Sequence, residues 1–95
     1  MAGKVRFSDK ALVDLESTSR YIAKDSVYYA RIFVQRVLRI VRSLNQFPEA
    51  GRIVPECDLP NIREKFLGHY RIVYRIHSEW IEIVAICHGS KLLKL

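Results

Sequence analysis

Ionisable side chains concentrate in the second half of the chain, where they could bind or cleave a polyanion. They are Arg52, Arg63, Lys65, Arg71, Arg75, His88 and Lys91, together with Glu49, Glu56 and Glu64. Metal-free cleavage of RNA needs a base for the 2′-hydroxyl, cations for the crowded phosphorane and an acid for the departing oxygen. Glutamate or histidine, arginine or lysine, and histidine again meet these needs. The residue types therefore permit a metal-independent endoribonuclease.

His88 is the preferred acid or base because it ends an apolar run, and imidazole is the side chain that changes charge near neutral pH. The alternative is a structural histidine that hydrogen-bonds to a neighbouring strand or loop. Arg63 and Arg71 lie in predicted strands, which fix the direction of their side chains. Their planar guanidinium groups could therefore bind a phosphate. They could equally pair with Glu64 or Glu82 across the sheet.

The sequence lacks the signatures of common enzymes. It contains no phosphate-cradling glycine loop, no Ser-His-Asp order, no nucleophile elbow and no HExxH zinc helix. Cys57 and Cys87 have neither CxxC spacing nor a histidine arrangement of zinc sites, which favours free thiols in a reducing cytosol. We therefore expect no metal and no cofactor.

Charge and length limit the classes of function. The chain has 95 residues, enough for one domain spanning 1–95, and sixteen Lys and Arg against ten Asp and Glu give a net charge of +6. This charge predicts a polyanionic partner, although it could serve solubility alone. The N-terminal residues show no apolar signal region, and the longest apolar run, Ile83–Cys87, is too short to cross a bilayer. A cytoplasmic protein is expected.

The first half of the chain predicts a strand and a helical hairpin. Residues 4–7 suit a short strand, and Ser8 with Asp9 suits the cap of a helix that ends near Lys24. Its apolar stripe is expected at Leu12, Leu15, Ser19 and Ile22, with Asp14, Glu16, Arg20 and Lys24 in water.

A second helix is predicted after the cap Asp25–Ser26, with helical periodicity over about four turns. Its inward residues are Ala30, Phe33, Val34, Val37, Ile40, Val41 and Leu44. Its other face carries Arg31, Gln35, Arg36, Arg39 and Arg42. This basic row is either a solvated face or a binding surface.

After an irregular proline-containing loop over residues 47–60, the pattern changes to alternation typical of strands. Strands are predicted at 62–66, around 71–76, and at 80–88. Tyr70 and Tyr74 are expected to pack in this sheet rather than stack on bases. The predicted fold is α+β: an N-terminal strand, an antiparallel two-helix hairpin, and a three-strand antiparallel meander that forms one sheet.

Short segments spread over nearly the whole chain together form a pattern that can be compared with known families. They are Ala11–Asp14 with Leu15, Tyr21–Ala23, Ala30 with Phe33, Leu44 with Phe47–Pro48, Gly51–Arg52, Ile62–Glu64, Gly68–Ile76, Ile83–Ile86 and His88–Gly89. In this order they resemble the RelE/ParE superfamily of type II toxins, the plasmid-stabilisation type. The resemblance implies a toxin neutralised by a cognate antitoxin, in a heterotetramer or higher assembly.

The resemblance also implies two possible mechanisms, since RelE-like members cleave messenger RNA at the ribosome and ParE-like members poison DNA gyrase. The Ser26-x-x-x-Ala30 entry to the second helix, and the absence of a clear aromatic residue after the last strand, favour the ParE branch. Against this, Arg63 and His88 sit where nuclease members carry comparable residues, with Glu49 or Glu56 as a loop acid.

We therefore favour gyrase inhibition narrowly over ribosome-dependent cleavage, with a non-toxic nucleic-acid-binding module as a third alternative. His88, Arg63 and Glu49 would be catalytic only in the nuclease. The residues expected to bind the target or a phosphate are Arg52, Arg63, Lys65, Arg71 and Lys91, and charge in the tail also includes Lys94.

Overall fold

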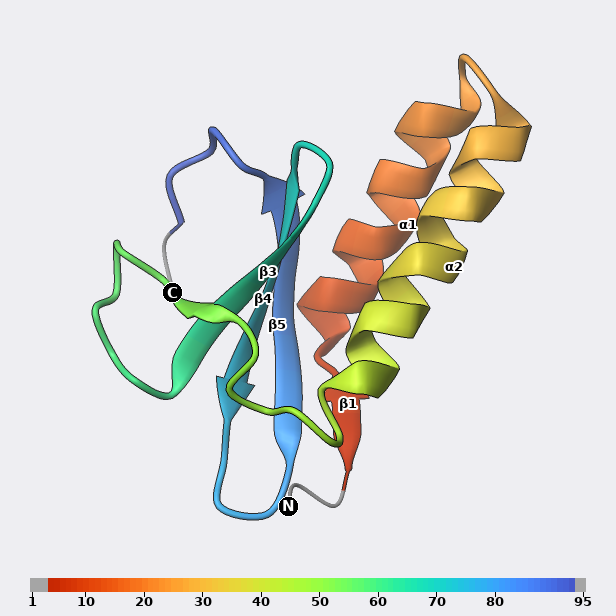
Figure 1. Cartoon of the computed structure of the whole chain (residues 1–95). Coiled ribbons are helices and arrows are strands. Elements are labelled where there is room, and N and C mark those ends of the chain that lie inside the picture. Colours follow the sequence, from red (N-terminus) through yellow and green to blue (C-terminus); the bar gives the residue numbers. More distant parts are fainter. Residues whose placement is uncertain (1–3, 94–95) are drawn as a thin grey trace.

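A computed structural model describes residues 4–93 as a five-stranded sheet with a two-helix hairpin on one face (Figure 1). The elements are β1 (Val5–Phe7), α1 (Asp9–Ala23), α2 (Val27–Ser43), β2 (Arg52–Ile53), β3 (Ile62–Leu67), β4 (Tyr70–Ile76) and β5 (Ile81–His88). The strand order is β1-β5-β4-β3-β2. The predicted α+β class and the three-strand meander β3-β4-β5 are confirmed.

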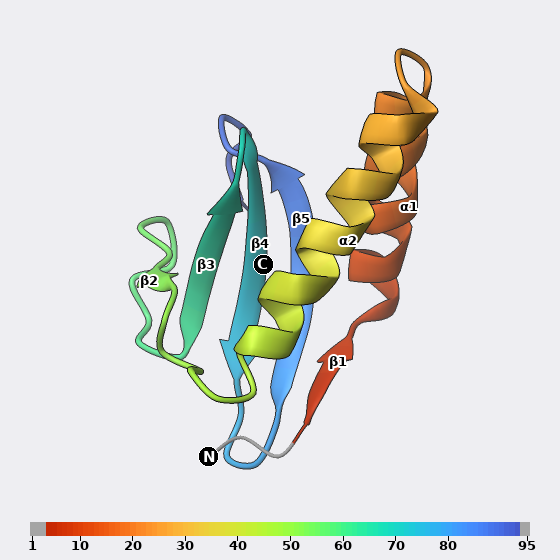
Figure 2. The same cartoon turned by 45° about the vertical axis from the view of Figure 1, so that its right-hand side comes forward.

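Two features of the sheet differ from the prediction. The sheet is mixed rather than wholly antiparallel, because β1 pairs with β5 in parallel, as Figure 2 shows. The region expected to be an irregular loop also contains β2, whose Arg52 and Ile53 pair with Glu64 and Arg63. A strand of two residues is too short to show a period of two, so the loop prediction was wrong at this point.

Both helices begin at the predicted serine caps. The Ser8 hydroxyl accepts a hydrogen bond from the Ala11 amide at 3.0 Å, and the Ser26 hydroxyl accepts one from Tyr29 at 3.2 Å. These bonds satisfy amides that the first turn of a helix leaves without partners. Within residues 4–93, neither helix has the length and apolar character needed to cross a membrane.

The inward face of α1 confirms the predicted stripe at Leu15 and Ile22, which pack against the core, but differs from it at other positions. Ala11 is fully buried, whereas Leu12 is 50% exposed. Asp14, which was expected to remain in water, accepts a hydrogen bond from the Ile86 amide at 3.0 Å. The reason is that β1 pairs with β5 only as far as Ile83, so the amide of Ile86 lies beyond the last strand pair. The Asp14 carboxylate takes the place of a further β1 residue.

The sheet carries a core on each face. The larger cluster, against the helices, contains Ala11, Phe33, Val37, Val41, Leu44, Ile72, Tyr74, Ile81, Ile83 and Ile86. The smaller cluster contains Val54, Ile62, Val73 and Ala85, with Cys57 and Leu93 packed against it. In Figure 1 the helices lie on one side of the sheet, and the loop after β2 and the C-terminal tail lie on the other. Both faces of the meander are therefore covered.

Tyr74 fixes the loop that follows α2. Its ring is fully buried, its hydroxyl donates to the Pro48 carbonyl at 2.7 Å, and it accepts from the Gly51 amide at 2.9 Å. Burial raises the pKa of this hydroxyl. A Cβ atom at Gly51 would lie 2.5 Å from the Glu64 carbonyl oxygen and 2.7 Å from the Tyr74 hydroxyl. Glycine is therefore required for the loop to reach the sheet.

We predict that Gly51→Ala destabilises the fold by about 3 kcal/mol or more, because the added methyl group meets backbone as well as the Tyr74 ring. Gly68→Ala is the matched control. Gly68 has a φ of 58° with nothing within 4 Å of an added Cβ, so its cost is confined to about 1–2 kcal/mol of backbone strain. Urea unfolding measures both, and equal costs would contradict the proposed close contact.

Candidate functional site

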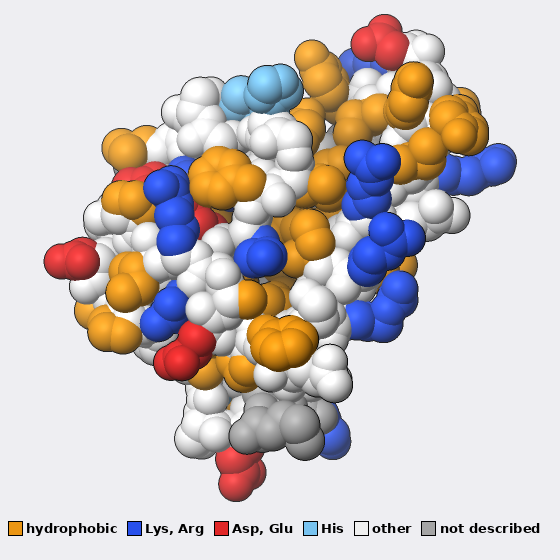
Figure 3. Space-filling model, viewed as in Figure 1, with side chains coloured by type: hydrophobic (Ala, Val, Ile, Leu, Met, Phe, Trp, Pro, Cys, Tyr) orange, Lys and Arg blue, Asp and Glu red, His pale blue; other side chains and the backbone are white. Residues whose placement is uncertain are grey.

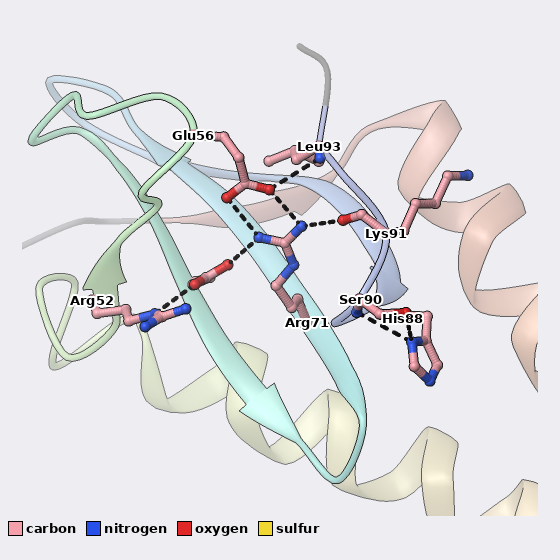
Figure 4. A network of polar contacts seen from close by, with 8 residues as sticks. Arg52, Glu56, Arg71, His88, Ser90, Lys91 and Leu93 are labelled. Atoms are coloured by element: carbon pink, nitrogen blue, oxygen red, sulfur yellow. Dashed lines mark hydrogen bonds and ion pairs between the residues drawn. The ribbon is translucent and has the colours of Figure 1, made fainter.

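Arg71 is the centre of a buried polar network on the face of the sheet away from the helices (Figure 4). The residue is only 3% exposed. Its Nη1 donates to Glu64 Oε1 and to Glu56 Oε1, both at 3.0 Å, and its Nη2 donates to Glu56 Oε2 at 2.8 Å. One guanidinium thus joins a strand carboxylate to a loop carboxylate.

The network continues to the strand at the edge of the sheet. Glu64 is 1% exposed, and its Oε2 accepts from Arg52 Nε at 2.6 Å. Arg52 also stacks over the Phe66 ring, and its side chain stays 59% exposed. Arg52 and Arg71 together therefore balance Glu56 and Glu64 in charge. Of these two expected phosphate-binding residues, only Arg52 remains accessible to a partner.

The same network holds the C-terminal tail against the sheet. Arg71 Nη2 donates to the Lys91 carbonyl, and Glu56 Oε2 accepts from the Leu93 amide at 3.0 Å. Leu93 packs against the smaller core cluster, while the Lys91 side chain is exposed. Lys94 lies outside the described residues. The tail is thus positioned by side chains from a loop and a strand that are remote from it in sequence.

The ionisation of the network reflects these contacts. Hydrogen bonds from Arg71 and from the Leu93 amide lower the pKa of Glu56 from 4.5 to about 2. Hydrogen bonds to Glu56, and to Glu64, raise the pKa of Arg71 despite its burial. Both groups are therefore charged over the physiological range of pH.

His88 lies at the other face of the sheet, at the end of β5 and opposite Tyr70. Its Nδ1 lies 2.7 Å from Ser90 Oγ and accepts from the Ser90 amide at 3.2 Å. The ring stacks on His69 with 6.1 Å between centroids and meets the edge of Tyr70 at 5.6 Å. Because a backbone N–H donates to Nδ1, the neutral ring carries its proton on Nε2.

The structure does not bring Arg63 and Glu49 to His88. Arg63 pairs with Tyr74, which is four positions along β4 from the partner of His88, or about 13 Å along the strand. The Arg63 side chain donates to the carbonyls of Pro60 at 2.9 Å and Gly51 at 3.0 Å. Arg63 therefore shapes the loop beside β2.

Glu49 has only a loose connection to this group. Its side chain is 79% exposed, and its Oε2 is 3.9 Å from Arg63 Nη2. Lys65 lies half-buried on β3, opposite Ile72 of the helix-facing core. Tyr70 packs edge-on against Phe33, so the packing role predicted for the two tyrosines is confirmed.

A largely apolar groove lies between the helices and the β3–β4 turn, and it was not predicted from the sequence. Its volume is about 270 Å³, and it is lined by Ile22, Tyr29, Ile32, Phe33, Arg36, Leu67, Gly68, His69 and Tyr70. The exposure of Tyr29, 63%, leaves a large aromatic side chain at its margin. The available signal was the surplus of apolar residues at the ends of both predicted helices.

Comparisons with known proteins agree with this fold. A family profile described as ParE toxin of type II toxin-antitoxin system, parDE, matches residues 5–93. A solved structure described as the chromosomal ParDE TA system from P. aeruginosa superposes with a TM-score of 0.72 at 23% identity, covering 90% of this chain and 94% of the other. A comparison with curated protein sequences gave no match.

We predict that the tail contacts weaken in acid through Glu56. Its pKa is depressed on folding, so its stabilising contribution is complete above pH 4.5 and is lost as the pH falls toward about 2. Glu56→Gln should flatten this part of the curve of melting temperature against pH. Glu79→Gln, in the exposed turn after β4, should preserve it. A Glu56→Gln curve parallel to the wild-type curve would contradict the assignment.

Proposed function

The chain belongs to the ParE toxin family of type II toxin-antitoxin systems, and we propose that it arrests growth by inhibiting DNA gyrase. One observation carries the choice of target. The three residues that would perform RNA cleavage do not converge, because Glu49 lies 3.9 Å from Arg63 whereas His88 lies about 13 Å from Arg63 along the strands. A toxin that acts by binding does not require them to converge.

The chemistry of RNA cleavage makes this separation important. An acid, a base and a phosphate-stabilising cation must all reach one phosphodiester, each within hydrogen-bonding distance. Here Arg63 is occupied by loop carbonyls, and Arg71 is occupied by Glu56 and Glu64. These two arginines are thus engaged in holding the fold together.

The second candidate is a RelE-like endoribonuclease that acts on messenger RNA at the ribosome. It is favoured by the exposure of His88 and by the exposed His69 ring that stacks on it. The non-toxic nucleic-acid module is set aside because the family is one of toxins.

The proposed partner in the neutralised state is a cognate antitoxin. The apolar groove can accept an aliphatic or aromatic side chain, and Arg36 at its lining can pair with an acidic neighbour in the same segment. Complementary charge on the antitoxin would accelerate association with this basic chain, so the association rate should fall as salt rises.

We predict that His88→Gln retains toxicity. Expression of the wild-type chain alone should arrest bacterial growth, and the adjacent small gene should restore it. Inhibition of gyrase by binding does not require His88 to transfer a proton. The variant should therefore inhibit supercoiling as the wild type does. A ribosome-dependent nuclease would instead lose about 10²- to 10⁴-fold in cleavage rate. A variant with an unchanged melting temperature and no toxicity would overturn the gyrase proposal.

We predict that Tyr29→Ala weakens antitoxin binding by roughly tenfold, because it removes an aromatic contact at the margin of the groove. Tyr29 is 63% exposed, so the fold should tolerate the change. Leu59→Ala, at a residue 49% exposed in the loop after β2, is the control and should bind normally. Titration calorimetry of the purified pair measures both, and equal affinities would place the antitoxin elsewhere.

A further inference from the structure

The outward face of α2 carries a straight line of hydrogen-bond donors. Its members are Tyr28, Arg31, Gln35, Arg39 and Arg42, all exposed. Their spacings of three and four residues place them on one line of the helix, which extends about 21 Å at 1.5 Å per residue. We refer to Arg31, Arg39 and Arg42 as the arginine ridge.

The charges of the arginine ridge are not neutralised within the part of the chain that the structure describes. The helix Val27–Ser43 contains no acidic residue. None of the ion pairs within residues 4–93 involves a ridge arginine, whereas Arg20, Arg52 and Arg71 all have carboxylate partners. Figure 3 shows blue side chains spaced along the part of the surface formed by α2.

The arginine ridge takes no part in the core packing of α2. The buried residues of α2 are Ala30, Phe33, Val37 and Val41, on the side that faces the sheet. Arg39 and Arg42, three residues apart, repel each other on the helix surface. A partner that supplies negative charge along this line would relieve the repulsion and gain three cationic contacts.

We propose that the arginine ridge binds the sugar-phosphate backbone of duplex DNA. A duplex presents one negative charge per about 1.7 Å of its axis, so a straight and rigid cationic line can meet phosphates along its length. Single strands are held mainly by stacking on aromatic side chains, and this line offers Tyr28 alone. A protein partner would need a buried apolar anchor, which the groove provides and the ridge does not.

This inference rests on the proposed function and deepens it. DNA gyrase acts on a DNA duplex, so a toxin that also holds the DNA would bind the enzyme–DNA complex more tightly than the enzyme alone. The ridge lies on α2 away from the sheet, and it is distinct from the network around Arg71 and from the groove. One surface can therefore contact DNA while others contact protein.

The test is direct binding of the purified full chain, made by cell-free synthesis, to a fluorescein-labelled 20-base-pair duplex. Fluorescence anisotropy is measured between about 50 and 200 mM salt. The ridge variant combines Arg31→Gln, Arg39→Gln and Arg42→Gln. The control variant combines Lys4→Gln, Arg6→Gln and Lys24→Gln, which lowers the net charge equally at exposed positions off the ridge. Melting temperatures of both are compared with the wild type.

We expect the ridge variant to bind at least roughly tenfold more weakly at low salt and to lose about three from the slope of log affinity against log salt. The control variant should keep most of the affinity at low salt and most of the slope. Equal losses in the two variants, or a wild-type chain that binds only single-stranded RNA, would overturn the proposal. Ridge-dependent DNA binding by a chain that leaves gyrase supercoiling unaffected would support the ridge and refute the gyrase target.

Discussion

The burial of one arginine constrains much of this structure. Arg71 lies inside the sheet's second face, where a cation without partners would cost several kcal/mol. Glu64 meets it from the neighbouring strand, and Glu56 must come from the loop after β2. The carbonyl of Lys91 accepts a further hydrogen bond from Nη2, while the buried Nε has no partner among the described residues. The loop and the tail are therefore placed by the need to neutralise this cation, and they in turn cover the smaller core cluster.

The same constraint divides the surface into parts with different uses. On the face covered by loop and tail, arginines and glutamates neutralise one another, so little charge remains for a ligand. On the other side of the sheet, the groove beside Tyr29 and Phe33 is largely apolar. Positive charge without a partner is concentrated on the outer surface of α2. Protein contacts and polyanion contacts are thus separated in space.

The elements that carry their own local signal could be predicted from the sequence. Ser8 and Ser26 cap the helices, and alternation along β4 places Ile72 and Tyr74 in the core. What could not be predicted depends on contacts between distant residues. Asp14 is drawn inward by an amide 72 positions away, and β2 has only two residues. Arg71 could be paired with Glu64 in advance, but its link to the tail required the folded chain.

The choice between the two mechanisms of this superfamily depends on which charges are free, since the fold is common to both. A nuclease must keep cations unpaired around the phosphate that it cleaves, because a guanidinium already bound to a carboxylate gives little further stabilisation to the phosphorane. Both terminal nitrogens of Arg71 are bound to carboxylates, and Arg63 is bound to loop carbonyls. Neither Arg63 nor Arg71 is therefore available to stabilise a phosphorane beside His88. The arginines of the ridge on α2 have no ion pair among the described residues, and their regular spacing suits binding along an extended polyanion rather than chemistry at one of its atoms.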